Sequence, residues 1–304
     1  MKIVIAGASG FLGRSLTKYF IEQNHQVIWL IRSIRETGLP VDQVQWDGIN
    51  RGDWVQALEG ADVLINLSGK SVDCRYTAAN MRQIYDSRLL STSILGEAIS
   101  QLENPPKVWL NASSATIYRH SEELEMDEFS GEIGTGFSVD VCQKWEQSFF
   151  DSQTPLTRKV ALRIAIVLGR DGGALQPLIN LCTVGLGGWQ GSGNQFFSWI
   201  DEIDFVRAVD HLIRNKEATG VYNLSSPNPI PNRDFMKTLR DVLGVKFGIP
   251  LPELLLEIGA FFIRTETELI LKSRRVVPSK LIAEGFKFVF PNLTDSLKPK
   301  ISKS

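Results

Sequence analysis

The feature that most constrains this chain is a strand, a glycine-rich turn and a helix within its first 23 residues. Lys2–Ala6 is rich in Val and Ile, Gly7-Ala8-Ser9-Gly10-Phe11-Leu12-Gly13 follows directly, and Arg14–Gln23 has apolar residues at helical spacing. Glycine lets a backbone approach a pyrophosphate, and free N–H groups at a helix N-terminus point at its charge. A tight turn without a ligand is the alternative, but the strand–turn–helix context favours a nucleotide site. The predicted contacts are Gly7, Ser9, Gly10, Phe11, Leu12 and Gly13.

The rest of the N-terminal half alternates short apolar runs with longer helical patterns. Further strands are expected at Gln26–Ile31, Gln43–Asp47, Val63–Leu67, Val108–Ala112 and Arg158–Leu168. Helices are expected at Trp54–Leu58, Ala79–Ser100 and Phe137–Phe150. Strand–helix–strand repetition is typical of a parallel, doubly wound sheet, so the sequence predicts an α/β fold.

The pattern changes after Gly169, where glycines crowd a partly irregular segment. Later elements are expected at Asp204–Arg214 (helix), Gly220–Leu224 (strand), a helix capped by Asn232, Leu254–Ile263 (buried helix) and Phe286–Phe290 (strand). We therefore predict a nucleotide-binding domain over residues 1–170, which also receives strands from 195–226. A mixed substrate-cleft region over 171–245 and a smaller α+β C-terminal domain over 246–298 complete the chain.

The charge balance and the cysteine content exclude several classes of protein. Lys plus Arg is 33 and Asp plus Glu is 34, so a nucleic acid or a membrane surface is not an expected partner. The three cysteines form no CxxC pair and the three histidines have no metal-ligand spacing, which argues against disulfides or a metal site and favours a reducing cytoplasm. No targeting segment or apolar run of ~18 residues is visible. The expected partner is a small-molecule substrate, and a homodimer is left open.

The end of the second strand predicts which nucleotide is bound. A site selective for NAD carries an acid there, but this chain has Leu30-Ile31-Arg32-Ser33 and no acid before Glu36. Arg32 is suited to pair with a 2′-phosphate, with Ser33 beside it, although a solvated surface arginine is the alternative. The sequence therefore favours NADP as the cofactor.

A second set of candidate cofactor contacts follows the strand at Val63–Leu67. The run Asn66-Leu67-Ser68-Gly69 lies at the carboxyl end of this strand, the edge at which open α/β sheets bind ligands. Small residues at Ser68 and Gly69 leave room for ribose and pyrophosphate. An asparagine that only caps a loop is the alternative for Asn66.

With these motifs and Ser113-Ser114-Ala115-Thr116-Ile117-Tyr118, the chain resembles the extended short-chain dehydrogenase/reductases, and more closely their atypical epimerase-family branch. Supporting stretches are Tyr85–Arg88, the glycines from Gly185 to Gly193, Phe197–Ile200, Asn223–Pro229 and Arg274–Pro278, the last within a small C-terminal domain of unknown function. The resemblance implies a Rossmann-type fold and an NADP-dependent oxidoreductase, or a nucleotide-sugar-epimerase-like enzyme, for an unknown small molecule. A non-catalytic NADP-sensing or regulatory protein, linked to cell division, is the alternative.

The resemblance also implies a serine that orients the substrate oxygen and a Tyr-x-x-x-Lys pair that moves the proton. Ser114 occupies the serine position. Counting back from Glu146 places Ser138 and Cys142 at the Tyr and Lys positions, and neither supplies a phenol or a fixed positive charge. The usual proton relay is therefore absent. Tyr118 is the candidate replacement, with a loop-packing tyrosine as the alternative reading.

Two further cofactor contacts follow from the same resemblance. Arg88, on the long helix beside the expected cleft, is predicted to bind a phosphate or a ribose, and an ion pair with Asp86 or a neighbour is the alternative. Val167, at the end of the expected strand Arg158–Leu168, is predicted to contact the nicotinamide or its ribose, with ordinary sheet core as the alternative. Cys142 is predicted to be a small buried residue rather than a nucleophile.

Overall fold

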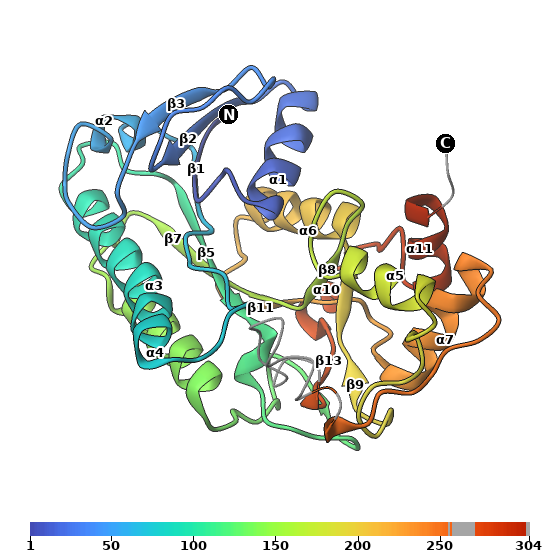
Figure 1. Ribbon diagram of the computed structural model, residues 1–304. Helices are drawn as coiled ribbons and strands as arrows, with labels where there is room; N and C mark the ends of the chain where they lie inside the picture. Colours follow the sequence, from blue (N-terminus) through green and yellow to red (C-terminus); the bar gives the residue numbers. More distant parts are fainter. Residues whose placement is uncertain (255, 257–270, 302–304) are drawn as a thin grey trace.

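The computed structural model describes residues 1–254, 256 and 271–301, and its centre is a seven-stranded parallel sheet (Figure 1). In spatial order the strands are β3 (Asp42–Gln45), β2 (Gln26–Ile31), β1 (Lys2–Ala6), β4 (Val63–Asn66), β5 (Val108–Ser114), β7 (Arg158–Ile164) and β11 (Gly220–Leu224). The chain order reverses between β1 and β4, where a ligand site is expected in a doubly wound sheet. The predicted Rossmann-type α/β fold is confirmed.

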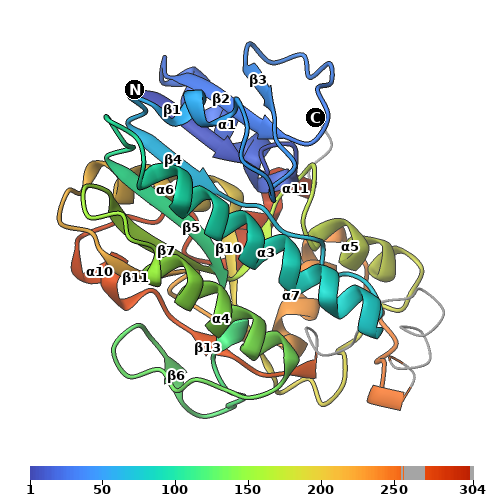
Figure 2. The same cartoon turned by 90° about the vertical axis from the view of Figure 1, so that its left-hand side faces the viewer.

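Helices cover both faces of this sheet. On one face lie α1 (Phe11–Glu22) and α6 (Glu202–Arg214), and on the other α2 (Val55–Leu58), α3 (Ala78–Ile99) and α4 (Phe137–Asp151). Figure 2 shows α3 and α4 side by side on their face. Successive residues of β1 from Ile3 to Ala6 enter the two different cores, so this part of the strand is apolar without interruption. Each fully buried Ile or Val contributes roughly 1.5–3 kcal/mol.

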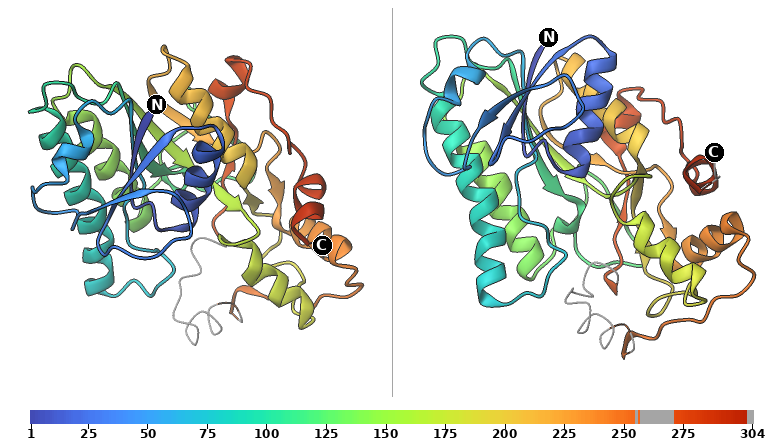
Figure 3. Two further views of the ribbon diagram at one scale, coloured as in Figure 1. Left: turned by 90° about the horizontal axis from the view of Figure 1, so that it is seen from above. Right: turned by 45° about the horizontal axis from the view of Figure 1, so that its top comes forward.

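Most of the remaining described elements form a smaller lobe beside the carboxyl edge of the sheet, seen from two sides in Figure 3. Its helices are α5 (Leu175–Thr183), α7 (Asn232–Leu243) and α11 (Leu293–Ile301). Two-stranded sheets pair β8 (Ile166–Leu168) with β10 (Trp199–Asp201), β9 (Phe196–Phe197) with β12 (Ile230–Pro231), and β6 (Glu125–Met126) with β13 (Arg275–Val276). Two short helices lie at the large sheet instead: η1 (Ala115–Ile117) follows β5, and α10 (Ser279–Ala283) packs against β11. Lys300 pairs with buried Asp201, which joins α11 to the start of α6.

The predicted single strand Arg158–Leu168 is wrong, because the chain changes sheets at Ala165. The N–H of Ala165 donates to Leu224 O (3.0 Å), whereas the next N–H, of Ile166, donates to Ser198 O (3.2 Å). The residues after the break form β8, which pairs with β10 in a separate two-stranded sheet. Of the strands expected from 195–226, only β11 joins the large sheet, since β9 and β10 pair elsewhere.

Two local expectations near the C-terminus are also wrong. Phe286–Phe290 forms no strand, because the N–H groups of Val289 and Phe290 donate to the buried Asp204 carboxylate (2.7 and 2.8 Å). Asn232 is the first residue of α7 and not its cap, since its Oδ1 accepts the Gln190 N–H instead (2.7 Å). The helix predicted at Leu254–Ile263 lies almost entirely outside the described residues. Among the described helices, none has both the length and the apolar character that a bilayer crossing requires.

Candidate functional site

The three glycines of the first turn have three different roles. Gly7 has a positive φ of 74°, and a Cβ added there would lie 2.8 Å from the Leu67 backbone. A Cβ added to Gly13 would lie 2.5 Å from Ala8, so Gly13 allows α1 to pack against its own loop. A Cβ added to Gly10 would meet only Gly7 O, at an ordinary 3.6 Å. The packing of the protein therefore requires glycine at Gly7 and Gly13. At Gly10 it does not, and the space there is open to a ligand.

A groove of about 670 Å³ opens at the carboxyl edge of the sheet, above this turn. Seven of the predicted cofactor residues line it: Gly7, Ser9, Gly10, Arg32, Leu67, Ser68 and Gly69. Gly10 is the N-cap residue of α1 beside the groove, and the helix has neither a side-chain cap nor an acid in its first turn. Its N-terminal N–H groups and partial positive charge are therefore available to an anion.

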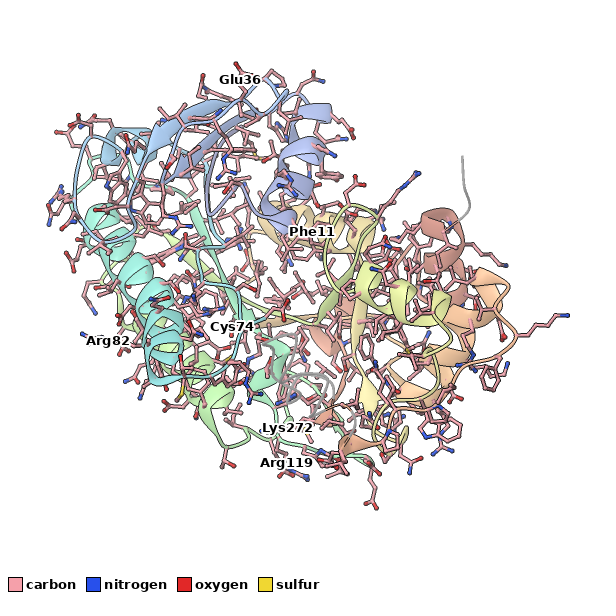
Figure 4. All side chains as sticks on the ribbon, in the orientation of Figure 1. Phe11, Glu36, Cys74, Arg82, Arg119 and Lys272 are labelled. Carbon is pink, nitrogen blue, oxygen red and sulfur yellow. The ribbon has the colours of Figure 1, made fainter. Side chains whose placement is uncertain are left out.

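Three predicted contacts are side chains that pack instead of lining the groove. Phe11 lies against the backbone of Gly169 and Gly172, where an added Cβ would come within 2.2 and 2.6 Å of its ring (Figure 4). Leu12 packs on the core between the sheet and α1, and Val167 is buried in the same core. The aromatic ring of Phe11 thus ties the glycine turn to the segment after β8.

Asn66 supports the groove from below. It is fully buried, its Nδ2 donates to Asn111 Oδ1 (2.7 Å), and its Oδ1 accepts the N–H of Ser68 (3.0 Å). The side chain does not line the groove. Asn66 therefore sets the path of the Leu67–Gly69 backbone, as in the loop-capping alternative.

Arg32 brings a positive charge to the rim of the groove at the end of β2. Its side chain is exposed, and no carboxylate pairs with it among the residues that the structure describes. Ser33 is exposed and lies outside the lining. Four further lining residues that the sequence does not predict are Trp46, Asp47, Gly48 and Ile49, which follow β3. No local motif marks these four residues, because only the pairing of β2 with β3 brings them to the groove.

Ser114 ends β5 at the same edge of the sheet. Its hydroxyl and that of Thr116 are hydrogen-bonded to each other, and the Thr116 N–H donates to Ser114 Oγ (3.2 Å). Both residues are partly exposed. The hydroxyl of Ser114 is thus held at the end of the strand by a local turn.

Tyr118, which the sequence offers as the replacement proton donor, is buried in the structure. Its side chain is fully buried, and its hydroxyl lies 3.0 Å from Asp127 O and 2.9 Å from Asn223 Oδ1. Arg163 donates to the same oxygen (2.9 Å) and stacks on the ring. Burial raises the pKa of the phenol despite the nearby arginine. Tyr118 therefore packs a loop against the sheet, which is the alternative that the sequence analysis gives for this residue.

Arg163 and Glu146 form a buried, two-pronged ion pair behind Tyr118. The nitrogens Nε and Nη2 donate to the two carboxylate oxygens (2.9 and 2.8 Å), and Ser113 adds a hydrogen bond to Oε1 (2.6 Å). Burial opposes the arginine charge, but the hydrogen bonds and charge of Glu146 outweigh it and raise the pKa of Arg163. The charges of Arg163 and Glu146 are therefore satisfied by each other and by Ser113 within the fold.

Ser138 and Cys142 lie one turn apart on α4. Both are buried, and burial, with a contribution from Glu146, raises the pKa of the Cys142 thiol to about 12. The thiol is therefore neutral at physiological pH, and Cys142 is the buried structural residue predicted. Neither side chain provides the missing proton relay.

We expect native protein to show a single reactive thiol. Cys142 and Cys182 are buried with raised thiol pKa values, whereas Cys74 is partly exposed. Since the thiolate is the reacting form, DTNB at about pH 8 should label Cys74 about a hundredfold or more faster than the other two. Cys74→Ser should remove the fast phase and Cys142→Ala should leave it unchanged. A fast phase that disappears in Cys142→Ala contradicts the burial argument.

Arg88 lies behind the groove wall rather than in it. Its Nη1 donates to Lys70 O and Ile84 O (both 3.1 Å), and its guanidinium stacks 5.1 Å from the Trp145 ring centroid. A Cβ on Gly69 would lie 3.1 Å from its Cζ. The alternative ion pair with Asp86 does not form, because Asp86 pairs with Arg82. Burial lowers the pKa of the Arg88 guanidinium, and among the described residues no carboxylate compensates its charge.

Two family profiles match the chain. The NAD dependent epimerase/dehydratase family matches residues 3–136, and a domain of unknown function, DUF1731, matches residues 251–298. The human epimerase family protein SDR39U1 is 30% identical over 303 residues, which cover 98% of this chain and 99% of the human protein. The epimerase family protein YfhF of Bacillus subtilis is 32% identical over 306 residues, covering 99% and 98% of the two chains.

Solved structures agree with this likeness. The crystal structure of human SDR39U1 (isoform 2) with NADPH superposes with a TM-score of 0.89 at 30% identity, covering 99% of both chains. A nucleoside-diphosphate sugar epimerase from Corynebacterium glutamicum superposes with a TM-score of 0.79 at 27% identity, covering 98% of this chain and 57% of the other. The likeness therefore extends over nearly the whole chain.

Proposed function

This chain belongs to the NAD dependent epimerase/dehydratase family, and on that premise we propose that it binds NADPH in the groove and is an oxidoreductase for a small molecule. The observation that carries the proposal is the open space at Gly10. Packing within the protein does not require a glycine there, whereas the approach of a pyrophosphate would. The uncapped start of α1 adds donors for that anion. The human relative of known structure was crystallised with NADPH, which supports the choice of dinucleotide.

Different residues of the groove lining would contact different parts of NADPH. Gly7, Ser9 and Gly10 would receive the pyrophosphate, Arg32 the 2′-phosphate, and Ser68 with Gly69 a ribose. When bound, NADPH supplies a hydride to an electrophilic carbon. Ser114 would orient the oxygen on that carbon from the end of β5. The three free cysteines fit a reducing compartment, and we place the protein in the cytoplasm.

We expect NADPH to bind about tenfold to a hundredfold more tightly than NADH, because one charge-assisted pair with Arg32 contributes roughly 1.5–3 kcal/mol. Arg32→Ala should remove the preference. Arg35→Ala is the matched control. It removes the same charge three residues further along the chain, and the Arg35 side chain lies outside the groove lining. Fluorescence titration of both dinucleotides measures this. Equal affinities in the wild type would refute the assignment of Arg32, and no binding of either would refute the function.

A binding protein without turnover is the second candidate. It is favoured by Ser138 and Cys142 at the positions where the resembled enzymes carry Tyr and Lys, and by the buried Tyr118. Screening aldehydes, quinones and nucleotide sugars for NADPH oxidation separates the two candidates. Capture of a protein partner only when NADPH is present, with no turnover, would favour the binding protein.

A further inference from the structure

We propose that Tyr76 is the proton donor of this site and that Arg88 is the positioning residue that stabilises its anion. The inference rests on the proposed function, because it assigns a role in hydride transfer from bound NADPH. Both residues lie outside α4: Tyr76 is on the connection between β4 and α3, and Arg88 is on α3. Figure 4 shows the neighbouring Cys74 on this connection, near the centre of the molecule.

The hydroxyl of Tyr76 reaches the position that the sequence leaves without a phenol. It lies 3.4 Å from Ser138 Oγ, in the first turn of α4. Its ring packs edge-on against Phe137, with 4.8 Å between the centroids, and Thr77 caps α3 immediately afterwards. These contacts hold a partly exposed phenol beside Ser138.

The same part of α4 contacts the end of β5. Cys142, one turn after Ser138, packs in one apolar cluster with Ala115, the neighbour of Ser114. The Tyr76 hydroxyl and the Ser114 hydroxyl are thereby brought to the same edge of the sheet. A substrate oxygen at this edge would have a hydroxyl that orients it and a phenol that protonates it.

Arg88 supplies the positive charge that Cys142 does not. Its electrostatic neighbours are the Cys142 thiol from α4, the Tyr76 phenol and the Cys74 thiol from the β4–α3 connection. Glu146, a buried carboxylate on α4, is paired with Arg163. A cation held by two carbonyls and the Trp145 ring, without a compensating carboxylate among the described residues, favours a phenolate beside it.

The proposed step balances in atoms and electrons. The carbonyl carbon accepts a hydride, with its two electrons, from bound NADPH, while the carbonyl oxygen takes the proton of the Tyr76 hydroxyl. The C=O double bond becomes an alcohol, NADPH becomes NADP⁺, and Tyr76 becomes a phenolate. Arg88 stabilises this phenolate until it regains a proton from solvent.

An absorbance titration at the tyrosinate wavelength tests the pairing without a substrate. The chain has five tyrosines, and burial raises the pKa of Tyr19, Tyr85, Tyr118 and Tyr222. We expect one tyrosine to ionise below the ordinary phenol range, because an opposite charge nearby lowers the pKa of a phenol. Tyr76→Phe should remove this transition, Arg88→Leu should raise it by about one unit, and Arg88→Lys should preserve it. Tyr19→Phe, a tyrosine outside the site, should leave it intact.

A transition that survives Tyr76→Phe, or that does not move in Arg88→Leu, overturns the pairing. Circular dichroism establishes that each variant is folded, and the conservative Arg88→Lys separates a lost charge from a lost contact.

Modification by tetranitromethane, which attacks tyrosinate, tests whether Tyr76 borders the reacting end of the cofactor. Peptide mass spectrometry should find Tyr76 nitrated first, and saturating NADPH should slow this about tenfold. If NADPH binds by fluorescence titration but does not protect Tyr76, the proton-donor role is wrong and the proposed function stands. If NADPH does not bind at all, the proposed function fails and with it the role assigned to Tyr76, whatever the titration shows about its charge.

Discussion

Replacing Gly10 with Val is expected to abolish NADPH binding while the chain still folds. The branched side chain would occupy the space in which the pyrophosphate approaches the turn, so we expect the affinity to fall about a hundredfold or more. An added Cβ meets no protein atom closer than 3.6 Å, and Gly10 has no positive φ, so the native backbone admits the substitution. The loss of glycine at the helix cap should reduce stability by only about 1 kcal/mol. Fluorescence titration with circular dichroism measures both effects.

Gly52→Val is the control for this substitution. Gly52 also has open space around it, with the closest atom, Trp54 Cδ1, at 3.5 Å, and it lies outside the groove lining. We expect this variant to bind NADPH as the wild type does. A folded Gly10→Val protein with unchanged affinity would mean that the glycine turn is only a turn.

Arg163→Leu is expected to destabilise the protein by about 3–5 kcal/mol, because it leaves the Glu146 carboxylate buried without its partner. The ion pair is two-pronged and nine-tenths buried, and Arg163 also donates to Tyr118. Denaturant unfolding measures the change as a lower midpoint. The exposed pair Arg82–Asp86 is the control, and Arg82→Leu should change stability by less than about 0.5 kcal/mol.

Adding Glu146→Leu to Arg163→Leu should recover part of the lost stability, since no buried charge then lacks a partner. A double variant less stable than Arg163→Leu alone would show that the unpaired carboxylate is not the source of the loss. The Ser113 hydroxyl loses its acceptor in the double variant, so we expect the recovery to be incomplete.

Local patterns determine more of the fold than of the site. The strand Lys2–Ala6 and the helix Phe137–Asp151 follow from apolar periodicity, and the glycine turn follows from backbone freedom and space. The strand break at Ala165 has no such signal, because Ile164 and Ile166 on either side of it are both apolar and the partners Leu224 and Ser198 are distant in the chain. The absence of a strand at Phe286–Phe290 likewise depends on the remote Asp204 carboxylate.

The sequence by itself determined the α/β sheet, the glycine turn after β1, the arginine at the end of β2 and the absence of a Tyr–Lys pair on α4. Only the tertiary structure decided that Tyr118 is locked by Asn223 and Arg163 while Tyr76 reaches Ser138. It also decided that Arg88 lies behind Gly69 without a carboxylate among the described residues. The physical reason is that periodicity and turn chemistry act between residues a few positions apart. The burial and pairing of a phenol or a guanidinium depend on groups that the fold brings together from distant parts of the chain, such as Tyr118 and Asn223, which are 105 residues apart.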